Sequence, residues 1–119
     1  MTDYKEVESF FNKSCMELAK VSEEYRSFGA LAKNTLKDGT AIPPKTKEMI
    51  AIALGIAARC NPCIVHHVKL GIQHGLTREE MVEVINISIL MGGGPSSMYG
   101  AAALACYDEF SVKKTAGAW

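Results

Sequence analysis

The apolar residues of this 119-residue chain recur three and four positions apart along most of its length. Two early stretches show the pattern: Val7, Phe10, Phe11, Cys15 and Leu18, and then Tyr25, Phe28, Ala32 and Leu36. This spacing forms one face of an α-helix, whereas a half-buried strand would alternate apolar and polar residues. No alternating stretch is found. We therefore expect an all-α fold in a single domain, residues 1–119.

Proline and glycine divide the pattern into about six helices. Pro43 and Pro44 begin the third, because the first helical turn needs no partner for its N–H groups. Asn61 is expected to cap the fourth, with Pro62 at its first position and the end at Gly75. The other expected limits are an end of the second helix at Gly39, a Thr77–Glu80 capping box opening the fifth, an end of the fifth near Met91, a sixth from about Pro95 to Phe110 and a frayed tail from Ser111 to Trp119.

The charge balance and the distribution of apolar residues limit the partners and the cellular compartment that we expect for this chain. Thirteen basic residues balance thirteen acidic ones, so neither nucleic acid nor a membrane surface is expected as a partner. The longest uncharged stretch, residues 84–107, is broken at Gly92-Gly93-Gly94-Pro95, which indicates two helices rather than a membrane span. The start of the chain is polar, without the apolar segment of a signal peptide. We therefore expect a cytoplasmic protein.

The third, fifth and sixth predicted helices are apolar on more than one face. A chain of this length has too few other elements to cover all of these faces. Gly100 and the three alanines that follow it also allow helices to approach closely. We expect part of this surface to lie between subunits of a homo-oligomer.

The segment from Cys60 to His67 is the strongest functional signal. In a reducing cytoplasm, a C-x-x-C pair either binds metal or is redox-active. Cys63 falls in the first turn of the predicted fourth helix, where unpaired N–H groups and the helix dipole favour a thiolate. His67 lies one turn further on the same face and could accept the thiol proton. Cys60 is placed to form a disulfide with Cys63.

The expected path of the chain brings Glu48 close to this segment. The third and fourth helices meet near Cys60 with almost no linker, so they should form an antiparallel hairpin. Glu48 then lies opposite roughly residues 69 to 72, about one turn from His67. A carboxylate there could orient the imidazole, as in a cysteine–histidine–acid relay.

The spacing of Glu48, Cys60, Cys63 and His67 resembles the active-site signature of the AhpD-like branch of the carboxymuconolactone decarboxylase family. The resemblance extends from the double proline to the sixth helix. It departs at Pro62, where the well-known peroxidase member has a second histidine.

The resemblance implies an all-α fold with the C-x-x-C motif at the start of the fourth helix, assembled as a trimer or hexamer. It implies a catalytic Cys60–Cys63 dithiol with Glu48 and His67 as proton relay, acting on small peroxides or passing electrons between a thiol donor and a peroxiredoxin. It implies no metal or organic cofactor. Family members that decarboxylate the lactone generally lack the C-x-x-C pair.

Less specific interpretations compete with this one. The two cysteines could be half of a zinc site in a non-catalytic binding or assembly module, although His66 and His67 are adjacent and face about 100° apart on a helix. A thioredoxin-like fold would need strands around the motif. His66 is expected in solvent or at an interface. The remaining expectations are packing roles: inert core thiols at Cys15 and Cys106, and aromatic packing or pocket lining at Tyr99 and Tyr107.

Overall fold

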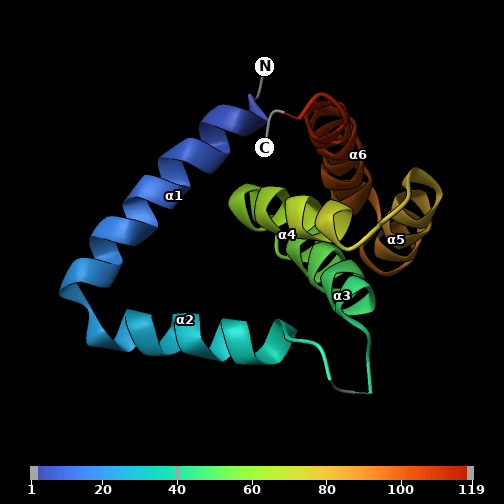
Figure 1. Ribbon diagram of the computed structural model, residues 1–119. Coiled ribbons are helices and arrows are strands. Elements are labelled where there is room, and N and C mark those ends of the chain that lie inside the picture. The colour runs from blue at the N-terminus through green and yellow to red at the C-terminus, as the bar shows by residue number, and fades with distance from the viewer. Residues whose placement is uncertain (1–2, 40, 118–119) are drawn as a thin grey trace.

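The computed structural model describes residues 3–39 and 41–117, and this part of the chain is almost entirely helical (Figure 1). Its helices are α1 (Tyr4–Val21), α2 (Glu23–Leu36), α3 (Pro44–Ala57), α4 (Asn61–Gln73), α5 (Arg78–Gly92) and α6 (Gly94–Thr115). The predicted all-α fold is confirmed, with the C-x-x-C motif at the start of α4.

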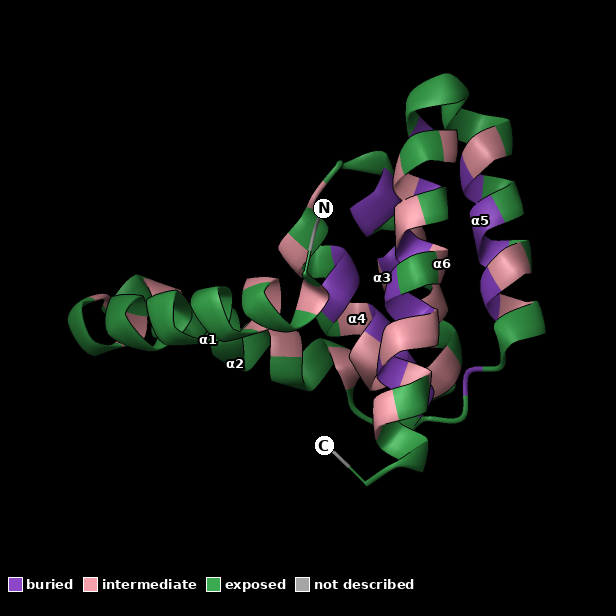
Figure 2. Ribbon diagram, turned by 90° about the horizontal axis from the view of Figure 1, so that it is seen from above, coloured by how far each residue is buried: buried purple, intermediate pink, exposed green. Residues whose placement is uncertain are grey.

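Helices α3 to α6 pack around one hydrophobic core, which is the purple region of Figure 2. Its buried members come from all four helices and the α4–α5 loop: Ile52, Ile56, Ile64, Val65, Val68, Ile72, Leu76, Met81, Val84, Ile85, Ala103, Cys106, Tyr107 and Phe110. Most are branched aliphatic residues, whose removal from water supplies the main driving force for folding. This four-helix body is the scaffold that holds the site.

The α4–α5 connection follows the predicted local rules. Gly75 has φ +88°, a conformation that favours glycine, and it ends α4. Thr77 and Glu80 form both halves of the expected capping box. Leu76 and Met81, on either side of that box, are both buried in the core.

Helices α1 and α2 form an arm that extends away from the four-helix body (Figures 1 and 2). Ser22 ends α1 and caps α2 with an extended backbone, so the chain turns sharply there. Neither helix contains a buried residue. The arm is attached through the start of α1, where Tyr4 and Val7 pack against the core.

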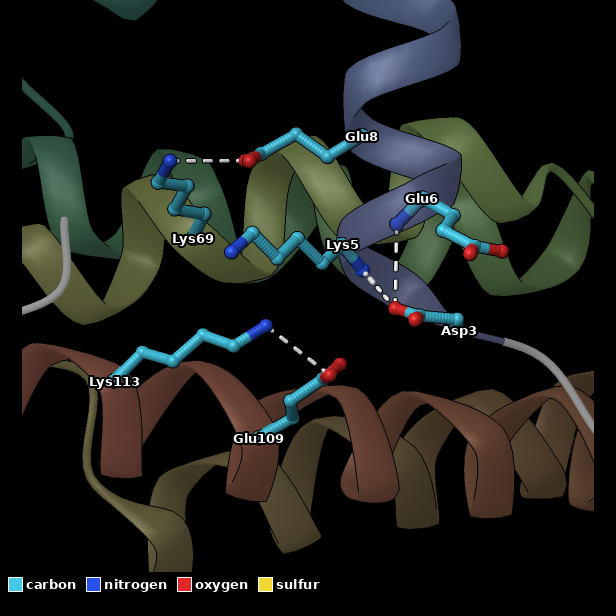
Figure 3. Close-up of polar contacts among 7 residues, drawn as sticks. All are labelled: Asp3, Lys5, Glu6, Glu8, Lys69, Glu109 and Lys113. Carbon is cyan, nitrogen blue, oxygen red and sulfur yellow. Dashed lines mark hydrogen bonds and ion pairs between the residues drawn. The ribbon is translucent and has the colours of Figure 1, made fainter.

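Polar contacts reinforce that attachment (Figure 3). Asp3 caps α1 by accepting hydrogen bonds from the backbone N–H groups of Lys5 and Glu6. One turn later, Glu8 forms an ion pair of 2.9 Å with Lys69 on α4. The ion pair fixes the first turns of α1 to the body, while the middle of the arm, around the turn between α1 and α2, extends beyond it.

Three local expectations were wrong. Cys60, not Asn61, caps α4, because Cys60 has the extended backbone and its sulfur accepts the N–H of Cys63. The tail is not frayed from Ser111: α6 continues to Thr115, and the Lys114 ammonium donates to the carbonyl of Ile72 on α4. Residues 118–119 of that tail lie outside the described residues.

The third wrong expectation is the core position of Cys15. Cys15 is exposed rather than part of the core, because α1 leaves the body before reaching it. None of the described helices combines the length and the apolar character that a membrane span requires.

Substituting alanine for Gly100 would test how closely α5 and α6 approach. A methyl group at Gly100 would come 2.7 Å from Cγ2 of Ile85, a β-branched side chain with little freedom to move away. We expect Gly100→Ala to lower the free energy of unfolding by about 1 to 2 kcal/mol, after the roughly 1 kcal/mol that alanine gains over glycine inside a helix. Urea unfolding would measure the change.

Gly94→Ala is the matched control. A methyl group at Gly94 would meet nothing within 4 Å, so this substitution should not lower stability. Equal losses for the two variants would contradict the close-packing explanation.

Candidate functional site

The turn between α3 and α4 places Cys60. After α3 the backbone N–H of Cys60 donates to the carbonyl of Gly55 at 3.0 Å, and that of Arg59 donates to Ile56 at 3.1 Å. This pair of bonds is a Schellman ending, which needs a left-handed residue. Arg59 takes that conformation, with φ 56°. The chain thus reverses within a few residues and leads directly into α4.

Cys60 and Cys63 are joined by a disulfide across the first turn of α4, with their Cα atoms 5.2 Å apart. The proximity expected from the three-residue spacing is confirmed. Cys60 is half-buried, whereas Cys63 is exposed. Cys63 also faces α3, since a Cβ built on Gly55 would be 3.6 Å from the Cβ of Cys63. Of the two residues, Cys63 is the more exposed.

The start of α4 presents backbone N–H groups to this pair. The sulfur of Cys60 accepts a hydrogen bond from the backbone N–H of Cys63 at 3.3 Å. The unpaired N–H groups of a helix start favour negative charge in the first turn. Both sulfurs lie within that turn, so the reduced pair has an environment that favours a thiolate.

His67 and Glu48 form a direct contact between α4 and α3. Nδ1 of His67 lies 2.7 Å from Oε1 of Glu48. An ionised carboxylate can only accept, which assigns the ring proton to Nδ1. Glu48 is 1% exposed and the side chain of His67 is 21% exposed. The predicted packing of α3 against α4 is confirmed. Glu48 lies opposite His67 itself, however, rather than one turn away.

His66 is exposed to solvent, as expected, but it also adjoins the pair. Its ring lies 4.9 Å from that of His67, edge to face. The pKa of His66 lies below its usual value, chiefly because surrounding protein atoms remove part of its hydration and also because of the neighbouring His67. The neutral form of His66 is therefore favoured.

A pocket of about 530 Å³ lies beside the buried carboxylate. Its lining comes from α2, α3, α4 and the loop after α2: Ala32, Lys33, Leu36, Lys37, Asp38, Pro44, Glu48, His66, Leu70 and His74. This pocket was not predicted from the sequence. The four-residue spacing of His66, Leu70 and His74 marks one face of α4, but nothing in the sequence places α2 opposite that face.

A smaller pocket of about 220 Å³ lies on the α6 side of the motif. It is lined by Tyr4, Asn61, Met98, Tyr99 and Ala102. Tyr99 therefore lines a pocket, one of the two roles expected for it. Tyr107 has the other role, because it is buried and donates a hydrogen bond to the carbonyl of Leu76 at 2.8 Å. Tyr4 was not identified from the sequence.

Within residues 3–39 and 41–117, no group of three or more histidine, cysteine or acidic side chains is arranged to hold a metal ion. The arrangement found instead is a dithiol pair at a helix start, with a histidine on the next turn held by a buried carboxylate. Chemically, such a group can form and break a disulfide while an adjacent base stores a proton.

Comparisons with known proteins identify the family of the chain. The model of the carboxymuconolactone decarboxylase family matches residues 22–105. An uncharacterized protein of Cupriavidus necator is 40% identical over 86 residues, which are 72% of this chain and 75% of that protein. Uncharacterized protein 4 in the cox locus of Paracoccus denitrificans is 36% identical over 83 residues, covering 70% and 74%.

Solved structures share the fold. A carboxymuconolactone decarboxylase family protein from Legionella pneumophila, in its apo form, has a TM-score of 0.86 and 37% identity, covering 91% of this chain and 96% of that one. A family protein from Thermotoga maritima has a TM-score of 0.80 at 22% identity, covering 98% and 96%. At 22% identity, the similarity to the Thermotoga maritima protein shows a shared fold and no more.

The two cysteines outside the disulfide should differ sharply in reactivity. Burial, and to a lesser extent nearby Glu109, raises the pKa of the Cys106 thiol to about 12. At pH 8 its thiolate fraction is on the order of 10⁻⁴, against about a quarter for a free cysteine. We expect the oxidised protein to react with a thiol reagent at the exposed Cys15 more than a hundredfold faster than at Cys106.

Cys15→Ser is the control for this measurement, because it should remove the fast phase and leave the slow one. A fast phase that persists in this variant would show that Cys106 is accessible and would contradict the packing described for α6.

Proposed function

This chain belongs to the carboxymuconolactone decarboxylase family, and we propose that it is a thiol–disulfide oxidoreductase of the AhpD-like kind. It would use Cys60 and Cys63 to reduce a small peroxide or to pass electrons from a thiol donor to a peroxiredoxin. The observation that carries the proposal is the disulfide at the start of α4, with the His67–Glu48 pair one turn away.

In the reduced protein, Cys63 is the attacking residue. It is the more exposed of the two residues and lies four residues from His67, on the same face of α4. Because Glu48 holds Nδ1 of His67, the ring accepts the Cys63 proton at Nε2. Glu48 fixes the ring orientation and stabilises the imidazolium that results. The helix start stabilises the thiolate.

The peroxide reaction balances with the two thiols alone. The Cys63 thiolate attacks one peroxide oxygen, so an S–O bond forms while the O–O bond breaks, and the leaving alkoxide takes the proton stored on His67. The Cys60 sulfur then attacks the sulfenic acid, forming the disulfide. The departing hydroxide takes the Cys60 proton and leaves as water. A thiol donor returns the two electrons.

We place this reaction in the cytoplasm, where thiol donors keep such pairs reduced. The proposed assembly is a homo-oligomer, either trimer or hexamer. No resident cofactor is required, because sulfur carries both electrons.

Lactone decarboxylation, for which the family is named, would need neither sulfur, and a zinc module would lose its fold on chelation. The cysteine variants therefore separate dithiol chemistry from lactone decarboxylation, and chelation separates both from a zinc module.

A peroxide-consumption assay with a dithiol donor tests the proposal. We expect Cys60→Ser and Cys63→Ser each to abolish turnover, since each removes half of the disulfide. We expect His67→Gln to lower the rate by about 10²- to 10⁴-fold, the usual contribution of a general base. Glu48→Gln should lower it less. Unchanged turnover in both cysteine variants would exclude catalysis at this pair.

Alkylation of the reduced protein against pH tests the thiolate directly. In a Cys15→Ser, Cys60→Ser background, Cys63 is the reactive thiol that remains. We expect iodoacetamide to react with a midpoint clearly below about 8.5, the value for a free cysteine, because the helix start and His67 stabilise the thiolate. Adding His67→Gln should move the midpoint upward. A midpoint equal to that of free cysteine would refute activation.

A further inference from the structure

The α1–α2 arm has an apolar surface that is exposed to solvent. Several large apolar side chains are exposed along it: Phe10, Phe11, Met16, Leu18, Val21, Phe28 and Leu31. Phe10 is 64% exposed and Phe28 is 62% exposed. Most of the stability of a helix in a protein comes from packing of its apolar face, and a helix of 14 residues such as α2 is marginal in water without it. The arm therefore needs a covering surface.

The total surface of the chain indicates how large that covering surface is. The chain exposes 7528 Å². A compact monomer of this mass, 12.9 kDa, exposes about 6,300 Å². The excess, on the order of 1,200 Å², exceeds the roughly 800 Å² that each partner buries in a standard stable interface. The net charge of zero adds no repulsion between copies of the chain.

A second apolar surface lies between α3 and α5, near the start of α6. It contains a groove of about 410 Å³ lined mainly by apolar residues, with Leu54, Ile87 and Met91 among them. Met91 is 81% exposed, and Leu90 beside it is 80% exposed. In Figure 1 the arm and α5 lie on opposite sides of the body, so the arm of one chain does not cover its own groove.

We infer that a second copy of this chain occupies this groove with its α1–α2 arm, and that this contact holds α2 in place as the outer wall of the pocket at Glu48. Arm and groove are different surfaces, so each copy uses one to bind the next copy and the other to be bound. Such head-to-tail contacts form a ring when the rotation closes.

The effect on the pocket follows from how weakly α2 is held within one chain. Ala32, Lys33 and Leu36 of α2 line the pocket at Glu48, yet no residue of α2 is buried. The Lys47 ammonium donates to the carbonyls of Thr35 and Lys37, at 2.7 and 2.9 Å, and these bonds attach the end of α2 to α3. Release of the arm would therefore open the pocket beside the buried carboxylate.

Molar mass in solution tests the interface. The wild type should have a multiple of 12.9 kDa at micromolar concentration. An arm variant, Phe10→Glu with Phe28→Glu, and a groove variant, Leu90→Glu with Met91→Glu, should each fall to a single copy. Val112→Glu is the matched control, because Val112 is 69% exposed on α6, outside both surfaces, and this variant should keep the wild-type mass. A single-copy wild type would overturn the inference, as would either double variant that retains the full mass.

Mixing the two double variants distinguishes this contact from arm-to-arm pairing and from loss of folding. The arm variant keeps an intact groove and the groove variant keeps an intact arm, so an equimolar mixture should form a species of two copies. If each variant stays a single copy in the mixture, arm-in-groove pairing is wrong.

Amide hydrogen exchange tests the effect on the pocket wall. In both single-copy variants, the amides of α2 should exchange at least about tenfold faster than in the wild type, because an unsupported helix of this length frays. Unchanged exchange would show that α2 does not depend on the second copy. The role of the pocket rests on the proposed function, but neither measurement uses turnover, so the two can fail separately.

Discussion

The short reversal between α3 and α4 is the constraint on which the site depends. Two antiparallel helices joined by a few residues must lie side by side, so residues equally far from the turn face each other. Arg59 accepts a left-handed backbone there, and Cys60 both ends the turn and caps α4. One local structure therefore positions the disulfide, the helix start and the contact between Glu48 and His67.

The buried carboxylate is the second constraint. An ionised group that loses its water is costly unless a hydrogen-bond partner replaces it. Glu48, almost fully buried, has that partner in the imidazole of His67. In the proposed mechanism, the contact that satisfies the acid also fixes which ring nitrogen is left to accept the thiol proton. Stability and the proposed chemistry thus require the same contact, and neither side chain can be replaced without affecting both.

The sequence predicted most of the four-helix body because its signals are local. Prolines at helix starts, the Thr77–Glu80 capping box and apolar spacing each act within a few residues, and the structure has helices where they indicate. Predictions that needed distant contacts were less accurate. Cys15 lies on an apolar face in the sequence, but that face is exposed because α1 leaves the body. The end of α6 depends on Lys114 reaching α4, which no local pattern reveals.

By itself, the sequence determined the helical fold, the pairing distance of Cys60 and Cys63, and the neighbourhood of Glu48 and His67, because each follows from spacing along one helix or across one short turn. Tertiary structure alone decided three features. These are the direct bond between Glu48 and His67, the pocket that α2 forms against α4, and the path of the arm away from the body. The physical reason is that these features depend on how helices pack across long separations in the chain, where sequence spacing sets no distance.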